Sequence, residues 1–173
     1  MVDILDKVQG IAELGKSTEE KQRTINVSEV FYVWELLAAK YDILDSTNLV
    51  ENFINDPDLK YITHKFKTHL EKSIKELDKL ISNYGIPYPV RPPVENITTA
   101  MFEHFTDRFV YEEIFASIQF FFPIISSAFM NSTSPKVSKI FKNFLLEAVE
   151  LQELIIEYGK LKGFLVAPHV YKA

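Results

Sequence analysis

Glycine and proline residues interrupt the chain near its middle. The segment 85–93 reads Gly-Ile-Pro-Tyr-Pro-Val-Arg-Pro-Pro and holds four of the eight prolines. Gly85 suits the left-handed position that follows a helix C-terminus, and closely spaced prolines favour an extended polyproline conformation. A helix therefore cannot continue through this segment. Because about eighty residues of helical pattern lie on either side, the segment divides the protein into two comparable halves.

Capping residues mark two helices in the first half. Asn26 to Glu29 has the spacing of a capping box, so we expect a helix from there to about Ile54. Asp56-Pro57 combines a good N-cap with a proline suited to the first helical turn, and it predicts a second helix that ends at Gly85. The apolar residues of these helices recur with helical period and mark their expected core sides: Phe31, Trp34, Ala38, Ile43 and Leu49 in the first, and Leu59, Ile62, Phe66, Leu70, Leu77 and Leu80 in the second.

The second half contains the same signals. Thr106 or Asp107 caps a third helix that ends near Met130, and we expect Pro123 to kink it. Ser134-Pro135 begins a fourth helix, which ends at Gly163. Each half is therefore expected to be a helical hairpin, with repeats at residues 27–85 and 105–163.

Three segments lie outside these helices. Residues 1–25 are expected to form a short helix at 3–14, followed by a polar linker or mobile arm. Residues 86–104 connect the two hairpins, and we expect a short helical turn at residues 98–105. The tail 164–173 is apolar, so we expect it to lie along the bundle.

The two halves are variations on one pattern. When the second half is moved back by 78 residues, seven positions carry the same residue without a gap. The matched pairs are Phe31 and Phe109, Glu35 and Glu113, Ala38 and Ala116, Pro57 and Pro135, Ile62 and Ile140, Phe66 and Phe144, and Gly85 and Gly163. Residues 31, 35 and 38 share one helical stripe, and the helix-starting prolines and helix-ending glycines coincide. The pattern indicates an internal repeat.

Two hairpins that bury their apolar stripes against each other make a four-helix bundle. Residues 85–105 can cross the length of such a bundle, because extended chain covers roughly 3 Å per residue. We therefore predict an all-α fold: a ferritin-like four-helix bundle built from two tandem hairpins with one long crossover.

Composition limits the function. The net charge of −5 argues against a nucleic-acid partner, and the absence of cysteine excludes disulfides and thiol catalysis. No secretory signal is visible at the N-terminus, which favours a cytoplasmic protein. Ile114 to Met130 carries no charge, but it contains Gln119 and Pro123 and lacks basic flanks. We interpret it as a buried helix rather than a membrane span.

One set of polar residues follows the repeat. Glu35 corresponds to Glu113, and His69 corresponds to Glu147 at the same offset. Glu35 and Glu113 lie on the repeated stripe, and the other two come three residues after Phe66 and Phe144, so all four are expected to face inward. Ferritin-like di-iron proteins place a Glu on two helices and a Glu-x-x-His on the other two at such positions.

The ligand set is incomplete for a di-iron centre. Phe66 and Phe144 occupy the Glu positions of both Glu-x-x-His motifs, and Glu147 replaces the second His. Four inward ligands could still hold a single iron, manganese or zinc ion. The alternative is a metal-free relic in which at least one carboxyl pKa is raised by its neighbours. His64 and His69 should point to different sides, His104 and His169 should be surface residues, and no nucleophile with a base is apparent.

The sequence also resembles the coat-F-like family of ferritin-like proteins from spore-forming bacteria. The resemblance covers residues 26–171 and rests on the two-hairpin layout, the Gly-Ile-Pro-Tyr-Pro joint at 85–89 and the ending Gly-Phe-Leu-Val-Ala-Pro-His-Val-Tyr at 163–171. Phe164 stands where that family has Trp, and Pro168-His169 where it has a proline pair. The resemblance implies a spore-coat or sporulation-associated protein, and it implies no chemistry.

Two functional hypotheses follow. The first is a non-catalytic structural or interaction protein, a homo-oligomer such as a dimer that binds other coat proteins, with no cofactor. The second is a metal-binding protein with a redox role that uses Glu35, His69, Glu113 and Glu147. We favour the first, because the repeat is intact while the ligand set is degraded.

Overall fold

The protein is an all-α bundle of four long helices. The computed structural model describes residues 15–91, 105–166, 168–169 and 171. Its elements are α2 (Thr18–Gln22), α3 (Val27–Val50), the 3₁₀ turn η1 (Glu51–Phe53), α4 (Pro57–Tyr84), α5 (Asp107–Met130) and α6 (Pro135–Lys162). The four long helices begin where the sequence predicts, but the first ends at Val50 rather than near Ile54. The helix expected at 3–14 lies outside the described residues, as does the turn expected at 98–105 except for Phe105, which is not helical.

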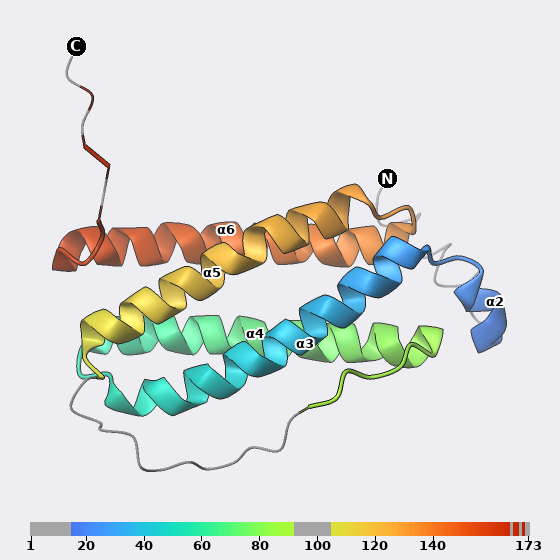
Figure 1. Ribbon diagram of the computed structural model, residues 1–173, viewed down its shortest axis with the longest axis horizontal. Helices are drawn as coiled ribbons and strands as arrows, with labels where there is room; N and C mark the ends of the chain where they lie inside the picture. Colours follow the sequence, from blue (N-terminus) through green and yellow to red (C-terminus); the bar gives the residue numbers. More distant parts are fainter. Residues whose placement is uncertain (1–14, 92–104, 167, 170, 172–173) are drawn as a thin grey trace.

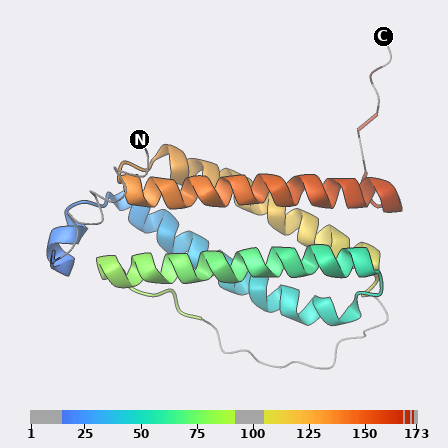
Figure 2. The ribbon, with the colours of Figure 1, turned by 180° about the vertical axis from the view of Figure 1, so that it is seen from behind.

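The helices form two layers (Figures 1 and 2). Helices α3 and α5 lie in one layer, and α4 and α6 lie in the other. Within each hairpin the two helices run antiparallel, and α4 ends at the opposite end of the bundle from the start of α5 (Figure 1). The connection between the hairpins must therefore return along the length of the bundle. This is the ferritin-like connectivity that the sequence predicts.

The core is built mainly as predicted on α4 and differently on α3. All six core residues expected on α4 are buried. On α3, however, Phe31, Trp34 and Leu49 are exposed, and Val33, Leu36 and Leu37 are fully buried instead. The reason is that α3 is apolar on both sides, so its periodicity does not identify the side that packs inside the chain.

Residues 15–23, expected to be a linker or mobile arm, include the short helix α2. Ser17 and Glu20 form a capping box at its start, with Glu20 N donating to Ser17 Oγ and Ser17 N donating to Glu20 Oε2. Gln22 Nε2 donates to the carbonyl oxygen of Tyr84 at 2.9 Å, which attaches α2 to the end of α4. The capping-box spacing was visible in the sequence, but a five-residue helix buries nothing of its own and has no periodic signal.

In each hairpin, a carboxylate near the start of the first helix accepts hydrogen bonds from the loop of the other hairpin. Glu29 is fully buried, and its Oε1 accepts hydrogen bonds from the amides of Thr133 at 3.0 Å and Ser134 at 2.7 Å. At the other end of the bundle, Asp107 Oδ1 accepts a hydrogen bond from the amide of Asn55 at 2.7 Å. Because loop amides that no helix satisfies need acceptors, these carboxylates fix how the hairpins meet.

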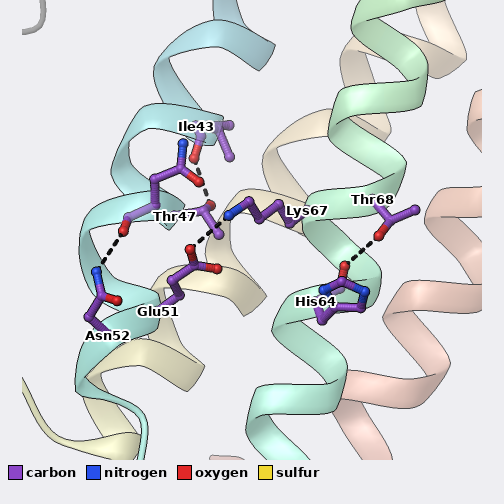
Figure 3. A network of polar contacts seen from close by, with 8 residues as sticks. Ile43, Thr47, Glu51, Asn52, His64, Lys67 and Thr68 are labelled. Atoms are coloured by element: carbon purple, nitrogen blue, oxygen red, sulfur yellow. Dashed lines mark hydrogen bonds and ion pairs between the residues drawn. The ribbon is translucent and has the colours of Figure 1, made fainter.

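Near the loop of the first hairpin, an ion pair joins α4 to η1, and further hydrogen bonds lie within α3 and α4 (Figure 3). Lys67 Nζ on α4 reaches Glu51 Oε1 at 2.7 Å, and Thr47 Oγ1 donates to the carbonyl of Ile43 at 2.6 Å. Both members of the ion pair are partly exposed, so we assign the pair less than about 1 kcal/mol of stability. His64 is exposed, and its carbonyl accepts from Thr68 Oγ1.

The C-terminal tail differs from the prediction. Phe164 packs beside Tyr111 and Tyr158, with ring centroids 5.7 and 6.1 Å away. Beyond it the described residues lead away from the bundle (Figure 1), and Val166 is 84% exposed. The apolar character of the tail therefore does not place it along the helices.

Gly159 lets α6 approach Tyr111 closely. A Cβ at residue 159 would lie 2.1 Å from Tyr111 Oη and 2.5 Å from its Cζ. Alanine normally favours a helix over glycine, but here we expect Gly159→Ala to lower the free energy of unfolding by about 2 kcal/mol, because the buried ring must shift. Denaturant melts measure this change. Tyr111→Phe in the same background should restore part of the loss, and a Gly159→Ala protein more stable than the wild type would contradict the close approach.

Candidate functional site

The four residues predicted to form one cluster lie in two separate places. His69 and Glu147 line a small cavity inside the bundle, whereas Glu35 and Glu113 line a groove on its outside between α3 and α5. Within residues 15–91 and 105–171, as far as they are described, no group of three or more His, Asp or Glu side chains is placed to hold a metal ion.

Glu35 and Glu113 face outward because their neighbours occupy the inward positions. Leu36 and Leu37 follow Glu35 and are fully buried, and Ile114 follows Glu113 and is 2% exposed. Phe31 and Phe109, one turn before each Glu on the same stripe, are 55% and 36% exposed. The repeated stripe of the first helix of each half is thus an outer surface, not the core side that the sequence suggests.

The interior cavity lies between all four long helices. Its lining includes Lys40 from α3, Phe121 from α5, His69 from α4 and Glu147 from α6, and its free space is about 30 Å³. Phe66 and Phe144 also line it, at the positions that hold carboxylates in di-iron proteins. A space of this size holds about one water molecule, so the cavity has no room for an organic substrate.

Lys40 supplies the cavity with its own cation. The residue is only 5% exposed, and its Nζ lies 4.4 Å from the centroid of the Phe121 ring and 5.2 Å from that of Phe144. Burial lowers the pKa of Lys40 from 10.5 to about 8, although the nearby charge of Glu147 acts in the opposite direction. The two aromatic faces and the carboxylate partly replace the water that the ammonium group loses.

Glu147 is the carboxylate of this site. Its Oε1 accepts a 2.5 Å hydrogen bond from Lys72 Nζ, and its Oε2 lies 3.4 Å from His69 Nδ1. The hydrogen bond to Glu147 raises the pKa of Lys72. One carboxylate thus faces two ammonium groups and an imidazole, whereas the sequence analysis expected three carboxylates and one imidazole. A divalent cation at this position would meet the positive charge of Lys40.

Lys40 was missed by the sequence analysis although a signal exists. Buried residues of α3 recur every one or two turns on one side of the helix, at Val33, Leu36, Leu37, Lys40 and Thr47. A lysine on that stripe indicates a buried ammonium group. The repeat instead predicts the stripe that contains Phe31, Glu35 and Ala38 as the core side, which is the wrong side of the helix.

The position of His69 leads to a test of the site. The His69 side chain is 26% exposed, and Nδ1 makes no hydrogen bond with the described residues. We therefore expect His69→Leu to change the free energy of unfolding by less than about 1 kcal/mol, because the cations that neutralise Glu147 remain. Denaturant melts at pH 7 measure it. A loss of about 3 kcal/mol would instead indicate a broken buried pair, as the four-residue cluster requires.

The outer groove is the larger of the two sites. We use this name for the depression between α3 and α5 that is lined by the small side chains of Ala38, Ala39, Ala116 and Ser117, with a volume of about 490 Å³. Three carboxylates also line it, those of Glu35, Asp42 and Glu113, and Phe120 stands at one side. None of the three forms an ion pair or hydrogen bond with the described residues.

Several large apolar side chains of α5 lie outside the core. In the described part of the chain α5 is the one helix long and apolar enough to cross a membrane by length and composition, and 28% of its most apolar stretch is buried. The sequence predicts that Ile114 to Met130 is buried in the bundle, and the structure buries only part of this segment. Phe120 is 49% exposed and Met130 is 74% exposed.

Comparison with known proteins places the chain among ferritin-like bundles. A putative spore coat protein from Bacillus halodurans C-125 superposes with a TM-score of 0.78 at 20% identity, covering 86% of this chain and 96% of that one. A two-domain protein from Anabaena variabilis ATCC 29413, with DJ-1/ThiJ/PfpI-like and ferritin-like domains, superposes with a TM-score of 0.65 at 14% identity, covering 84% and 41%. At these identities the likeness shows the fold alone.

Sequence comparison identifies a family. No curated protein matches the chain. Residues 14–173 match the family described as protein of unknown function DUF3231, and membership of a coat-F-like family stays a prediction. Since the match covers nearly the whole chain, this ferritin-like bundle belongs to the DUF3231 family.

Proposed function

We propose that this protein is a non-catalytic structural component of the spore coat that binds other proteins through the outer face of α3 and α5. The observation that carries the proposal is the set of large apolar side chains that α5 leaves exposed: Phe109 and Phe129 at 36%, Phe120 at 49% and Met130 at 74%. Soluble proteins rarely expose large contiguous apolar surfaces unless these bind a partner. The association with a spore coat is supported by the fold shared with a putative spore coat protein and by the coat-F-like sequence motifs.

The interior cavity also supports a structural role. Its carboxylate is neutralised by lysines of the same chain, and its free space admits about one water molecule. Catalysis requires room for a substrate beside the reacting groups, which this cavity does not offer.

The location is tested by fractionating purified spores of the source organism. We expect an antibody against the protein to detect it in the alkali- and detergent-extracted coat fraction, and not in the lysed core. Detection only in the core or in vegetative cytosol would contradict the coat assignment. Size-exclusion chromatography with light scattering tests the expected homo-oligomer, and a 20 kDa monomer at high concentration would contradict it.

A metal-binding role is the second candidate, favoured by the His69–Glu147 pair. These two side chains reach across from neighbouring helices and could give a transition-metal ion two ligands, whereas structural zinc takes four. Elemental analysis of protein purified without chelators tests this candidate. Stoichiometric iron, manganese or zinc that His69→Leu removes would favour metal binding over the structural role, and its absence after reconstitution would end the second candidate.

A further inference from the structure

We infer that the outer groove binds an amphipathic helix of another protein that carries lysine or arginine residues at the centre of its contact. The inference rests on the proposed function, because it names the partner of the same outer face. Its basis is the combination of exposed apolar side chains on α5, a groove lined by small side chains, and carboxylates without partners among the described residues.

The shape of the groove suits a helix. Ala38 and Ala39 on α3 face Ala116 and Ser117 on α5, so a third helix can approach the two backbones closely. The groove extends over residues 35–43 of α3, which correspond to about 12 Å of helix at 1.5 Å per residue. This length matches two to three turns of a bound helix, which is the usual contact when a helix docks in a groove.

The charges of the groove decide which helix fits. Glu35, Asp42 and Glu113 are its three charged residues, and each needs a cation when a partner excludes water from the groove. Lys40 on the same helix cannot serve, because its side chain points into the interior cavity. The partner must therefore supply the positive charge.

The same charges disfavour two other occupants. A second copy that packed face to face would bring six carboxylates together, and like charges across an interface cost several kcal/mol. An anionic membrane surface would repel the groove for the same reason. Apolar contacts remain available on both sides of the carboxylates, at Phe31 and Phe120, which are 55% and 49% exposed.

The experiment uses the full-length protein and two synthetic 18-residue peptides labelled with fluorescein. Both peptides carry the same leucine and alanine face, and they differ only at three central positions, which are lysine in one and glutamate in the other. Fluorescence anisotropy gives the dissociation constants at 50 and 500 mM NaCl. Trp34, the single tryptophan, lies on α3 one turn before Ala38 and reports binding through its emission.

We expect the lysine peptide to bind at least tenfold more tightly than the glutamate peptide, and less tightly at 500 mM NaCl. The triple variant Glu35→Gln, Asp42→Asn, Glu113→Gln should remove most of this difference. A matched control makes the same charge change on the exposed face of α6, through Glu150→Gln, Glu153→Gln and Glu157→Gln. The affinity of this control for the lysine peptide should stay within twofold of the wild type. Ala116→Phe, which fills the groove from an exposed position, should abolish binding of both peptides.

Four results would overturn the inference. Equal affinity for the two peptides would show a docking surface without charge preference, which leaves the proposed function standing. Absence of lysine-peptide binding at 500 µM would exclude a basic helix, and the spore fractionation would still decide the coat assignment. A dimer that Ala116→Phe converts to a monomer would identify a second copy as the occupant. Sedimentation with phosphatidylcholine–phosphatidylglycerol vesicles, lost in Ala116→Phe, would identify a membrane.

Discussion

Replacing Glu29 by alanine is expected to lower the free energy of unfolding by about 4 kcal/mol. The carboxylate is fully buried and accepts hydrogen bonds from the amides of Asn26, Thr133 and Ser134. Alanine would leave these donors without their acceptor, and a buried unsatisfied polar group costs about 1–3 kcal/mol. Urea denaturation followed by circular dichroism measures the change.

The chain offers a matched control for this variant. Glu20 occupies the same capping-box position in α2, but its hydrogen bond with Ser17 is exposed. We expect Glu20→Ala to cost less than about 1 kcal/mol, because water replaces the lost acceptor. Equal losses for the two variants would mean that Glu29 acts only as a helix cap and does not hold the loop between α5 and α6.

Replacing Lys40 by methionine is expected to raise the free energy of unfolding at pH 7 by about 3 kcal/mol. Burial lowers the pKa of Lys40 from 10.5 to about 8, and this lowering corresponds to about 3 kcal/mol against the charged form. Methionine fills a similar volume without the charge, and Glu147 keeps its hydrogen bond to Lys72. Replacing a buried ionic group by an apolar one of similar size is often stabilising.

The effect of pH has a definite sign. Below pH 8 both the folded and the unfolded chain hold the Lys40 proton, so the full penalty acts on the wild type. Between pH 8 and 10.5 the unfolded chain binds more protons, so the contribution of Lys40 to stability rises with pH. We therefore expect the advantage of Lys40→Met to shrink over this range and to be small above pH 10.5.

Thermal or urea melts of the wild type and of Lys40→Met from pH 6 to 11 test this expectation. The other titratable groups are the same in both proteins, so their contributions cancel in the difference between the two free energies of unfolding. Lys75→Met, on the exposed side of α4, is the control and should show no such trend. A Lys40→Met protein less stable than the wild type at pH 7 would mean that the two aromatic contacts and Glu147 outweigh the cost of burying the ammonium group.

The sequence predicts the fold well because its strongest signals are local. Pro57 and Pro135 begin α4 and α6, and Gly85 and Gly163 end them in the left-handed conformation. The core side of α4 was identified correctly because its lysines lie on the opposite side. These features depend on backbone sterics and on amphipathicity within one helix, so no knowledge of the partner helices is needed.

The site could not be predicted in the same way. Which side of α3 enters the core depends on the helices around it, and α3 carries apolar residues all round. Phe31 and Trp34 suggested one side as the core, while Val33 and Leu36 occupy it in the structure. As a result Glu35 and Glu113 were placed inward and Lys40 was overlooked. The pair His69 and Glu147 lines the interior as predicted, because α4 and α6 each have a clear polar side.

The contacts that hold the loops have a consequence for assembly. Glu29 of one hairpin binds the loop of the other, and Asp107 does the same in the reverse direction. Each loop thus makes hydrogen bonds to the other hairpin in addition to those within its own hairpin, and nothing in these contacts requires both partners to belong to one polypeptide. Two chains that exchanged hairpins would form the same hydrogen bonds in two complete bundles, joined by the segments between α4 and α5. Because these hydrogen bonds are the same in both cases, an exchange of hairpins between two chains would need no new contact between the hairpins.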